Sequence, residues 1–382
     1  MFHFFGNIPE EIKIFFDEKN VIKIACREKQ LVIVCDDGLY VWGFECIAEE
    51  THPFKLDFFD DKEIHKVACG KNHILVVCND GVYAWGDNSY GQLGEGDIED
   101  VLSPVRQHFF DGKVVCKISC GDGHTIVACN DGVYAWGDDS WGQLGTDDKD
   151  EVHYYRLNIN SCYIGEDSFD SYPGKLDLEK VRNIVCGSQH TIALCDDGVY
   201  AWGENYEGQL GRGYSGWDTY AHLPVKVDFF DEKKIFYFFR YITKKEVLKI
   251  YSGYYHTMAV CNDGVYAWGE NGCGQLGTGN THDEPSPVKL DFFDGKEVYK
   301  IICGYDHTMA ICNDGIYAWG SNDEGQLGFE QLDLEPLARV VLSPKKIESI
   351  DYNVKKIICG KDFSIVEQPQ IKAVVAPVMR RD

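Results

Sequence analysis

Residues 312–328 read CNDGIYAWGSNDEGQLG, and this phrase recurs six times along a chain of 382 residues. Self-similarity of this kind indicates a repeat architecture, in which each unit buries its apolar face against its neighbours. The chain is therefore expected to consist of repeats, although its length alone suggests two or three domains. The Trp-Gly pairs, at intervals of 43, 51, 66, 66 and 51 residues, begin at Trp42, Trp85, Trp136, Trp202, Trp268 and Trp319.

A second phrase precedes these copies, and its clearest example is IICGYDHTMAI at residues 301–311. It recurs around His73, His124, His190 and His256, and in degraded form at Cys26 and Cys359. The histidine phrase, which begins each repeat, therefore has seven copies, whereas the Trp-Gly phrase that follows it has only six. Residues 2–7 (FHFFGN) resemble residues 82–88 (VYAWGDN), so the N-terminus is predicted to supply the missing seventh copy of the Trp-Gly phrase.

Each unit is predicted to form short strands separated by tight turns. The Asn-Asp-Gly sequence at residues 313–315 supplies the positive φ that a hairpin turn requires. The flanking runs, 308–312 and 316–319, have the β-branched and aromatic content of buried strands. A further strand, residues 287–290, precedes the unit, and helical periodicity is nowhere sustained. Four strands repeated radially describe the blade of a propeller.

The predicted fold is therefore all-β: a seven-bladed β-propeller of four-stranded antiparallel blades in a single domain, residues 1–366. The last blade combines residues 354–366 with residues 2–16, so that the N- and C-terminal segments close the ring. Two insertions interrupt the repeat, at residues 146–174 and 212–247. Residues 367–382 are expected to form a C-terminal tail.

The repeat resembles that of the regulator of chromosome condensation family. The resemblance rests on Cys-Gly-x-x-His-Thr, Asp-Gly-Val-Tyr-Ala-Trp-Gly and Asn-x-x-Gly-Gln-Leu-Gly, and it covers nearly the whole chain. It implies a seven-bladed propeller that serves as a platform for protein partners. The founding member is a nuclear guanine-nucleotide exchange factor for a Ran-type GTPase, and its contacts include acidic residues in the Gly-x-x-His turns. The matching acidic residues here are Asp122 and Asp306.

The charge balance favours a protein partner over an anionic one. Subtracting 62 acidic from 37 basic residues gives a net charge of −25. Because phosphate neutralisation needs clustered lysines and arginines, direct binding to nucleic acid or to an anionic membrane is not expected. The N-terminal residues lack the pattern of a secretory signal, and no apolar stretch reaches the length of a membrane span. An intracellular protein, cytoplasmic or nuclear, is expected, and composition leaves a virion or host-cell location open.

The repeated histidines and cysteines are predicted to be structural. Blade symmetry would hold the five histidines apart, whereas zinc needs ligands at about 2.0 to 2.1 Å. Each histidine is expected to bond the backbone of its own turn. Twelve of the sixteen cysteines lie in the two phrases, and buried thiols are favoured over one disulfide per blade. The Gly-x-Gly-x-x-Gly at residues 211–216 lacks a following helix. No cofactor, metal or catalytic site is predicted.

The two insertions are the predicted partner-binding segments, because binding residues concentrate in loops on a rigid scaffold. Acidic neighbours surround the aromatics of the first insertion, and the second holds an aromatic and basic cluster. The alternative for the second is an extra hairpin packed on its own blade, at about even odds. The candidate binding residues are Tyr154 and Tyr155 in the first insertion, and Phe236, Tyr237, Phe238, Phe239, Arg240 and Tyr241 in the second.

Two functions follow from these observations. The first is a non-enzymatic interaction or assembly scaffold that binds a protein partner or copies of itself. The alternative is a guanine-nucleotide exchange factor for a Ran-like small GTPase, for which Asp122 and Asp306 are the candidate contacts. Release of labelled GDP from the GTPase separates the two.

Overall fold

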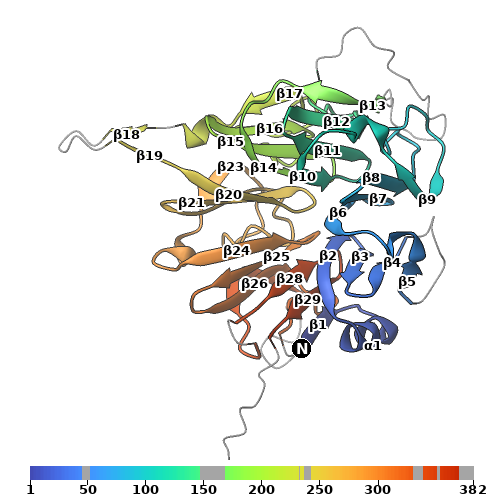
Figure 1. Cartoon of the computed structure of the whole chain (residues 1–382). Helices are drawn as coiled ribbons and strands as arrows, with labels where there is room; N and C mark the ends of the chain where they lie inside the picture. The colour runs from blue at the N-terminus through green and yellow to red at the C-terminus, as the bar shows by residue number, and fades with distance from the viewer. Residues whose placement is uncertain are drawn as a thin grey trace, which may run out of the picture.

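The computed structural model describes residues 1–44, 52–146, 168–231, 233–235, 242–329, 339–350 and 353–369. Its strands form antiparallel sheets arranged in a ring, the seven-bladed propeller that the repeat predicts (Figure 1). Six blades have four strands each, in chain order.

The first three blades take up the N-terminal half of the chain. Blade 1 consists of β2 (Val21–Arg27), β3 (Gln30–Cys35), β4 (Gly38–Trp42) and β5 (Phe54–Leu56). Blade 2 consists of β6 (Ile64–Cys69), β7 (His73–Cys78), β8 (Gly81–Gly86) and β9 (Val101–Arg106). Blade 3 consists of β10 (Val115–Cys120), β11 (His124–Cys129), β12 (Gly132–Asp138) and β13 (Phe169–Leu176).

The remaining blades complete the ring. Blade 4 consists of β14 (Val181–Cys186), β15 (His190–Cys195), β16 (Gly198–Gly203) and β17 (Ala221–Lys226). Blade 5 consists of β20 (Val247–Ser252), β21 (His256–Cys261), β22 (Gly264–Gly269) and β23 (Glu284–Lys289). Blade 6 consists of β24 (Val298–Cys303), β25 (His307–Cys312), β26 (Gly315–Ser321) and β27 (Val340–Lys346). Blade 7 consists of β28 (Lys356–Cys359), β29 (Phe363–Glu367) and β1 (Phe2–Gly6).

The first strand of each blade lines the axis of the ring. β2 contacts β6, and the contacts continue through β10, β14, β20, β24 and β28 back to β2. Because these strands run the same way along the axis, equivalent repeat positions lie at one level around it. A two-stranded ribbon, β18 (Lys233–Ile235) with β19 (Ile242–Lys244), projects between blades 4 and 5 (Figure 1).

The outermost strand of each four-stranded blade was assigned from the sequence to the wrong blade. Residues 287–290 were expected as a strand that precedes its own unit. They overlap β23, which instead pairs with β22 of the blade before, Tyr266 lying opposite Lys289. Each stretch between two blades therefore completes one blade and then begins the next.

The two ends of the chain close the ring in blade 7. β1 pairs antiparallel with β29, from Phe2 opposite Glu367 to Gly6 opposite Phe363. Backbone bonds extend this ladder at both ends: Asn7 N donates to Asp362 O at 3.0 Å, and Gln368 N donates to Met1 O at 2.9 Å. In Figure 1, β1 lies beside β29 although the two come from opposite ends of the sequence.

Residues 9–16, expected as part of the closing blade, do not form a strand. They lie largely in α1 (Glu10–Glu18), which begins after Pro9 with two acidic residues in its first turn, an arrangement that complements the helix dipole. Among the described residues, no helix has the length and hydrophobicity needed to cross a bilayer.

The sequence similarity to the repeat that suggested a strand in this segment comes from a Phe-Phe pair. In four other blades this pair belongs to a 3-10 turn, and in α1 it is Phe15 and Phe16. Phe15 packs edge-on against Tyr40 at 4.9 Å, much as Phe58 packs against Tyr83 at 5.1 Å. The same aromatic contact is thus made from a helix. The four 3-10 turns are η1 (Asp57–Phe59), η2 (His108–Phe110), η3 (Asp228–Phe230) and η4 (Asp291–Phe293).

Neighbouring blades are joined through the repeated tryptophan. Trp319 is fully buried, and its indole Nε1 donates to Gln275 O of the preceding blade at 2.9 Å. Gln275 belongs to the Gly-Gln-Leu-Gly sequence, whose last residue, Gly277, has φ of +78°. A Cβ at Gly277 would lie 2.8 Å from the same indole nitrogen, so the close approach requires glycine. Trp136, Trp202 and Trp268 make the equivalent bond to Gln92, Gln143 and Gln209.

The expectation that each repeat histidine bonds the backbone of its own turn was wrong. Each ring Nε2 instead meets a hydroxyl of the next blade. His256 lies 3.0 Å from Thr308 Oγ1, and that hydroxyl donates onward to the backbone carbonyl of Gln275. The histidines are thus buried links between blades. The other four pairs are His73 with Thr125, His124 with Thr191, His190 with Ser252 and His307 with Ser364.

Candidate protein-interaction face

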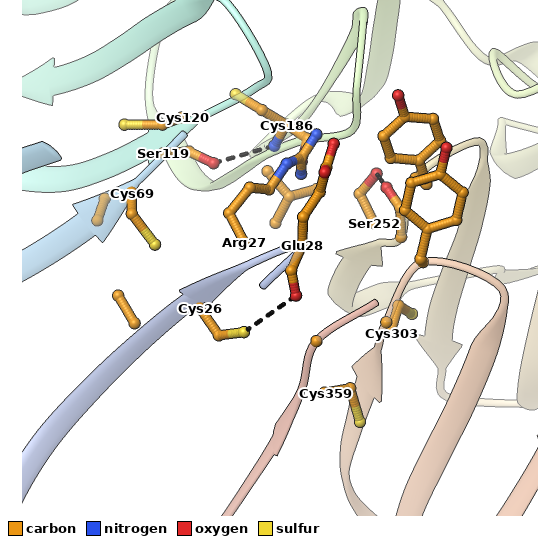
Figure 2. Close-up of a pocket in the computed structure, with 18 of the residues that line it drawn as sticks. Cys26, Arg27, Glu28, Cys69, Ser119, Cys120, Cys186, Ser252, Cys303 and Cys359 are labelled. Atoms are coloured by element: carbon orange, nitrogen blue, oxygen red, sulfur yellow. Dashed lines mark hydrogen bonds between the residues drawn. The ribbon is translucent and has the colours of Figure 1, made fainter. Parts of the chain in front are cut away.

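The inner strands end at one mouth of the central channel, and Arg27 closes it. A cavity of about 290 Å³ lies here, lined by the ends of all seven inner strands. Arg27 is the last residue of β2, and Figure 2 shows it among the cysteines that ring the cavity. Its guanidinium contacts Asp122 of blade 3 and lies near Cys186 O of blade 4 and the ring of Tyr254 in blade 5. One side chain therefore contacts three other blades across the axis.

Asp122 is engaged within this closure. Nη2 and Nε of Arg27 donate to its Oδ1 at 2.7 and 3.0 Å, and Ser188 Oγ donates to its Oδ2 at 2.7 Å. The side chains of Arg27 and Asp122 are 12% and 15% exposed. Burial alone would raise the pKa of Asp122, but the adjacent guanidinium outweighs it and the pKa lies below its ordinary value. The negative charge of Asp122 is thus already neutralised within the chain.

The repeat explains why an arginine fits at this position. In the other blades a glycine follows the cysteine, or follows Ser252 in blade 5, and a Cβ at Gly70 would lie 2.1 Å from Cε1 of His73. Blade 1 has Gln30 at the histidine position, opposite Arg27 in the strand pair, so no histidine ring stands where a side chain at residue 27 would clash with it. The two departures from the repeat occur together and produce the closure.

Six thiols and one hydroxyl surround the cavity, one from each blade. Burial raises the pKa of Cys186 to about 11 and that of Cys359 to about 12, so both remain protonated near neutral pH. All fourteen described cysteines are free thiols. Within the described ranges, no group of three or more His, Cys, Asp or Glu residues is placed to hold a metal ion. The ring consists of Cys26, Cys69, Cys120, Cys186, Ser252, Cys303 and Cys359.

Beside the closure lies a group of half-buried carboxylates from blades 4 to 6, here called the acidic cluster: Glu204, Glu270 and Asp306. Glu204 and Glu270 directly follow β16 and β22, and Asp306 lies in the Gly-x-x-His turn before β25. In each residue one carboxylate oxygen is buried without a hydrogen-bond partner among the described residues. Such an oxygen is costly unless a donor reaches it.

The members of the acidic cluster have raised pKa values. Burial, reinforced by Glu207, raises the pKa of Glu204 to about 7. Burial, reinforced by Asp306, raises that of Glu270 to about 8. Burial likewise raises the pKa of Asp306 to about 6, although Lys361 opposes the shift. Neighbouring carboxylates add to the effect of burial, since Glu207 raises the pKa of both Glu204 and Glu270, so a cation from outside would stabilise the cluster.

The structure places Asp122 and Asp306 on the same face but in different environments. Asp122 is paired with Arg27, whereas Asp306 belongs to the acidic cluster. The other predicted binding residues, Tyr154, Tyr155 and residues 236–241, lie outside the described residues. Arg27 was missed, although it is the one residue that replaces the glycine after the repeat cysteine. Glu204 and Glu270 were missed too, although an acidic residue follows Trp-Gly in four copies.

The comparison with protein families matches this architecture. The protein-family model described as RCC1-like domain matches residues 49–375. The chain belongs to the RCC1-like family. Its propeller is similar to the ultraviolet-B receptor UVR8 of Arabidopsis thaliana, 32% identical over 277 residues, which are 71% of this chain and 52% of the receptor. It is also similar to the human E3 ubiquitin-protein ligase HERC2, 34% identical over 58% of this chain and 4% of the ligase.

Solved structures show the same fold. Prp20p from Saccharomyces cerevisiae superposes with a TM-score of 0.71 at 21% identity, covering 92% of this chain and 82% of Prp20p. Human WBSCR16 superposes with a TM-score of 0.68 at 22% identity, covering 93% and 88% of the two chains. The RCC1-like chain thus spans about half of the receptor and a small part of the ligase that it matches, and more than four fifths of each of the two solved structures.

Proposed function

We propose that this RCC1-like chain is a non-catalytic protein-interaction module that binds a basic segment of a partner protein at the acidic cluster. The buried oxygens of Glu204, Glu270 and Asp306, unpartnered among the described residues, carry the proposal. An arginine or lysine from a partner would supply the donors and the positive charge that these carboxylates lack. The net charge of −25 would steer such a partner toward the propeller.

The closure by Arg27 supports a partner that docks on the face and does not enter the channel. Tyr254 stacks on Tyr305 with ring centroids 3.7 Å apart, and Lys361 lies over the ring of Tyr305 at 4.7 Å. These aromatic contacts hold the turns of blades 5, 6 and 7 together. A rigid aromatic surface next to unpaired charge is a suitable binding site for an arginine-rich segment.

A histone-tail peptide is a suitable basic probe, since the related structure of Prp20p is described together with binding to Gsp1p and histones. We expect the E204Q/E270Q/D306N variant to bind the peptide at least tenfold more weakly than the wild type. The D17N/E18Q/E99Q variant removes the same charge at exposed positions and should bind within about twofold of the wild type. An equal loss in both variants would show that only net charge matters and would contradict the proposal.

Exchange activity on a Ran-like GTPase is the alternative, and it relied on Asp122 and Asp306. Because Asp122 is occupied by Arg27, we propose the interaction module in preference to it. The folded chain at stoichiometric concentration should not accelerate release of labelled GDP from a Ran-type GTPase, and acceleration would favour the alternative. Sedimentation velocity at pH 8 tests self-association: charge repulsion between acidic faces predicts no dimer through this surface.

A further inference from the structure

The opposite mouth of the channel, where the inner strands begin, carries a ring of lysines. In six blades a lysine stands three residues before the ring cysteine or serine, and the remaining blade has Asn183 at that position. Five of these lysines line a cavity of about 450 Å³ together with isoleucine and valine side chains. We call these six residues the lysine ring: Lys23, Lys66, Lys117, Lys249, Lys300 and Lys356.

The lysine ring is largely unneutralised. Within the part of the chain that the structure describes, Lys66, Lys117 and Lys300 make no hydrogen bond and no ion pair. Lys23 and Lys249 donate to backbone carbonyls of the next blade, Ile64 O and Tyr299 O, each at 2.8 Å. Lys356 is the exception, because its Nζ lies 3.4 Å from Glu367. A backbone carbonyl positions an ammonium but does not cancel its charge.

Other lysines on the same side of the propeller are neutralised. The loops that lead into the inner strands hold a second set, each paired with an aspartate of a hairpin turn. Lys19 lies 2.6 Å from Asp37, and Lys62 and Lys113 lie 2.5 Å from Asp80 and Asp131. The repeat thus pairs each of these structural lysines with a carboxylate. In the lysine ring, by contrast, five of the six lysines have no carboxylate partner among the described residues, although the chain has a net charge of −25.

The members of the lysine ring also repel one another. Burial lowers the pKa of Lys300, and Lys249 of the adjacent blade lowers it further. The side chain of Lys300 is exposed and lines the cavity at this mouth of the channel. An arrangement of like charges in a partly apolar mouth is relieved by a multivalent anion.

We propose that the lysine ring binds a compact oligophosphate, a small molecule that carries several phosphate groups. The ring is formed within one channel mouth, so a nucleic-acid duplex is too wide to reach the ammonium groups. The net charge of −25 also disfavours the approach of an extended anionic membrane. A compact polyanion avoids both obstacles, and lysines from successive blades would contact its phosphates from all sides.

Calorimetric titration with inositol hexakisphosphate tests this proposal. We expect one site per chain, an affinity that falls steeply with salt, and a ligand-dependent rise in melting temperature. The K66Q/K117Q/K300Q variant should bind at least tenfold more weakly. Without ligand it should melt at or above the wild-type temperature, because it removes only repelling charges. The matched control K13Q/K29Q/K71Q removes equal charge elsewhere and should bind as the wild type does.

A gain-of-function variant provides the complementary test. Asn183 Nδ2 donates to Ile250 O of the next blade at 3.2 Å, as Lys23 does to Ile64 O, so N183K should complete the ring and tighten binding severalfold. Absence of binding by the wild type, or equal losses in the two triple variants, would overturn the proposal. Binding to phosphatidylcholine vesicles with 5% phosphoinositide as tightly as to the free compound would overturn the assignment to a free ligand.

Discussion

Arg27 of blade 1 binds Asp122 of blade 3 across the end of the channel, with 2.7 Å between Nη2 and Oδ1. Because both side chains are largely buried, removing one leaves an uncompensated charge. We expect R27A to lower the free energy of unfolding by about 2–4 kcal/mol. Chemical denaturation should show that R27A/D122N recovers part of this loss. A variant R27A as stable as the wild type would show that the closure contributes nothing to the fold.

The hydroxyl of Thr308 in blade 6 contacts both His256 and the carbonyl of Gln275 in blade 5, so its removal should weaken the interface between the two blades. T308V keeps the shape but leaves His256 Nε2 and Gln275 O without this partner, and should cost about 1–3 kcal/mol. T308S retains the hydroxyl, as Ser364 does opposite His307, and should cost less than T308V. Equal losses in the two variants would indicate that the methyl group, and not the hydrogen bond, matters.

The acidic cluster should make stability fall as pH rises. Because the folded-state pKa values of Glu204 and Glu270 lie above their ordinary value of 4.5, the folded chain holds these protons longer than the unfolded chain. Their contribution to stability is full below pH 4.5 and is lost by about pH 8. E204Q/E270Q should therefore be more stable than the wild type by about 1–2 kcal/mol at pH 8, and nearly equal to it at pH 5. A difference independent of pH would contradict this assignment.

The cysteines should be reduced and slow to react. In denaturant without reductant, thiol titration should find at least the fourteen free thiols of the described residues. In the native state at pH 8, the exposed Cys116 should react first, whereas ring members such as Cys186, with a pKa of about 11, should react slowly. A denatured count near zero would establish disulfides and contradict the structure.

The local features of the fold could be predicted from the sequence. Asn-Asp-Gly turns and short β-branched runs specify the hairpins, and the count of phrase halves specifies closure through β1 and β29. The errors arise where a contact is not local. α1 places Phe16 where a 3-10 turn places Phe59, so the two segments share the Phe-Phe pair but differ in backbone conformation. The histidine partners lie on the next blade, 52 residues away for His256, and no pattern within one turn specifies them.

The candidate site was less predictable, because its residues are departures from the repeat. Arg27 replaces the glycine of the other six blades and Gln30 replaces the histidine of five of them, and only their proximity in β2 and β3 reveals the exchange. The acidic cluster combines residues from three blades whose burial depends on the complete ring. Asp306 was named for its turn, and its two neighbours became evident from their buried oxygens.

The acidic cluster, in its ionised form, is proposed to bind a basic partner segment. The most direct test is the dissociation constant for a histone-tail peptide at pH 5.5 and pH 8.5, for the wild type and for E204Q/E270Q/D306N. Wild-type binding should tighten at least tenfold between these pH values, because Asp306, Glu204 and Glu270 ionise with pKa values of about 6, 7 and 8. The variant should bind weakly at both. Binding that is equally tight at both pH values, or that survives in the variant, would contradict the account.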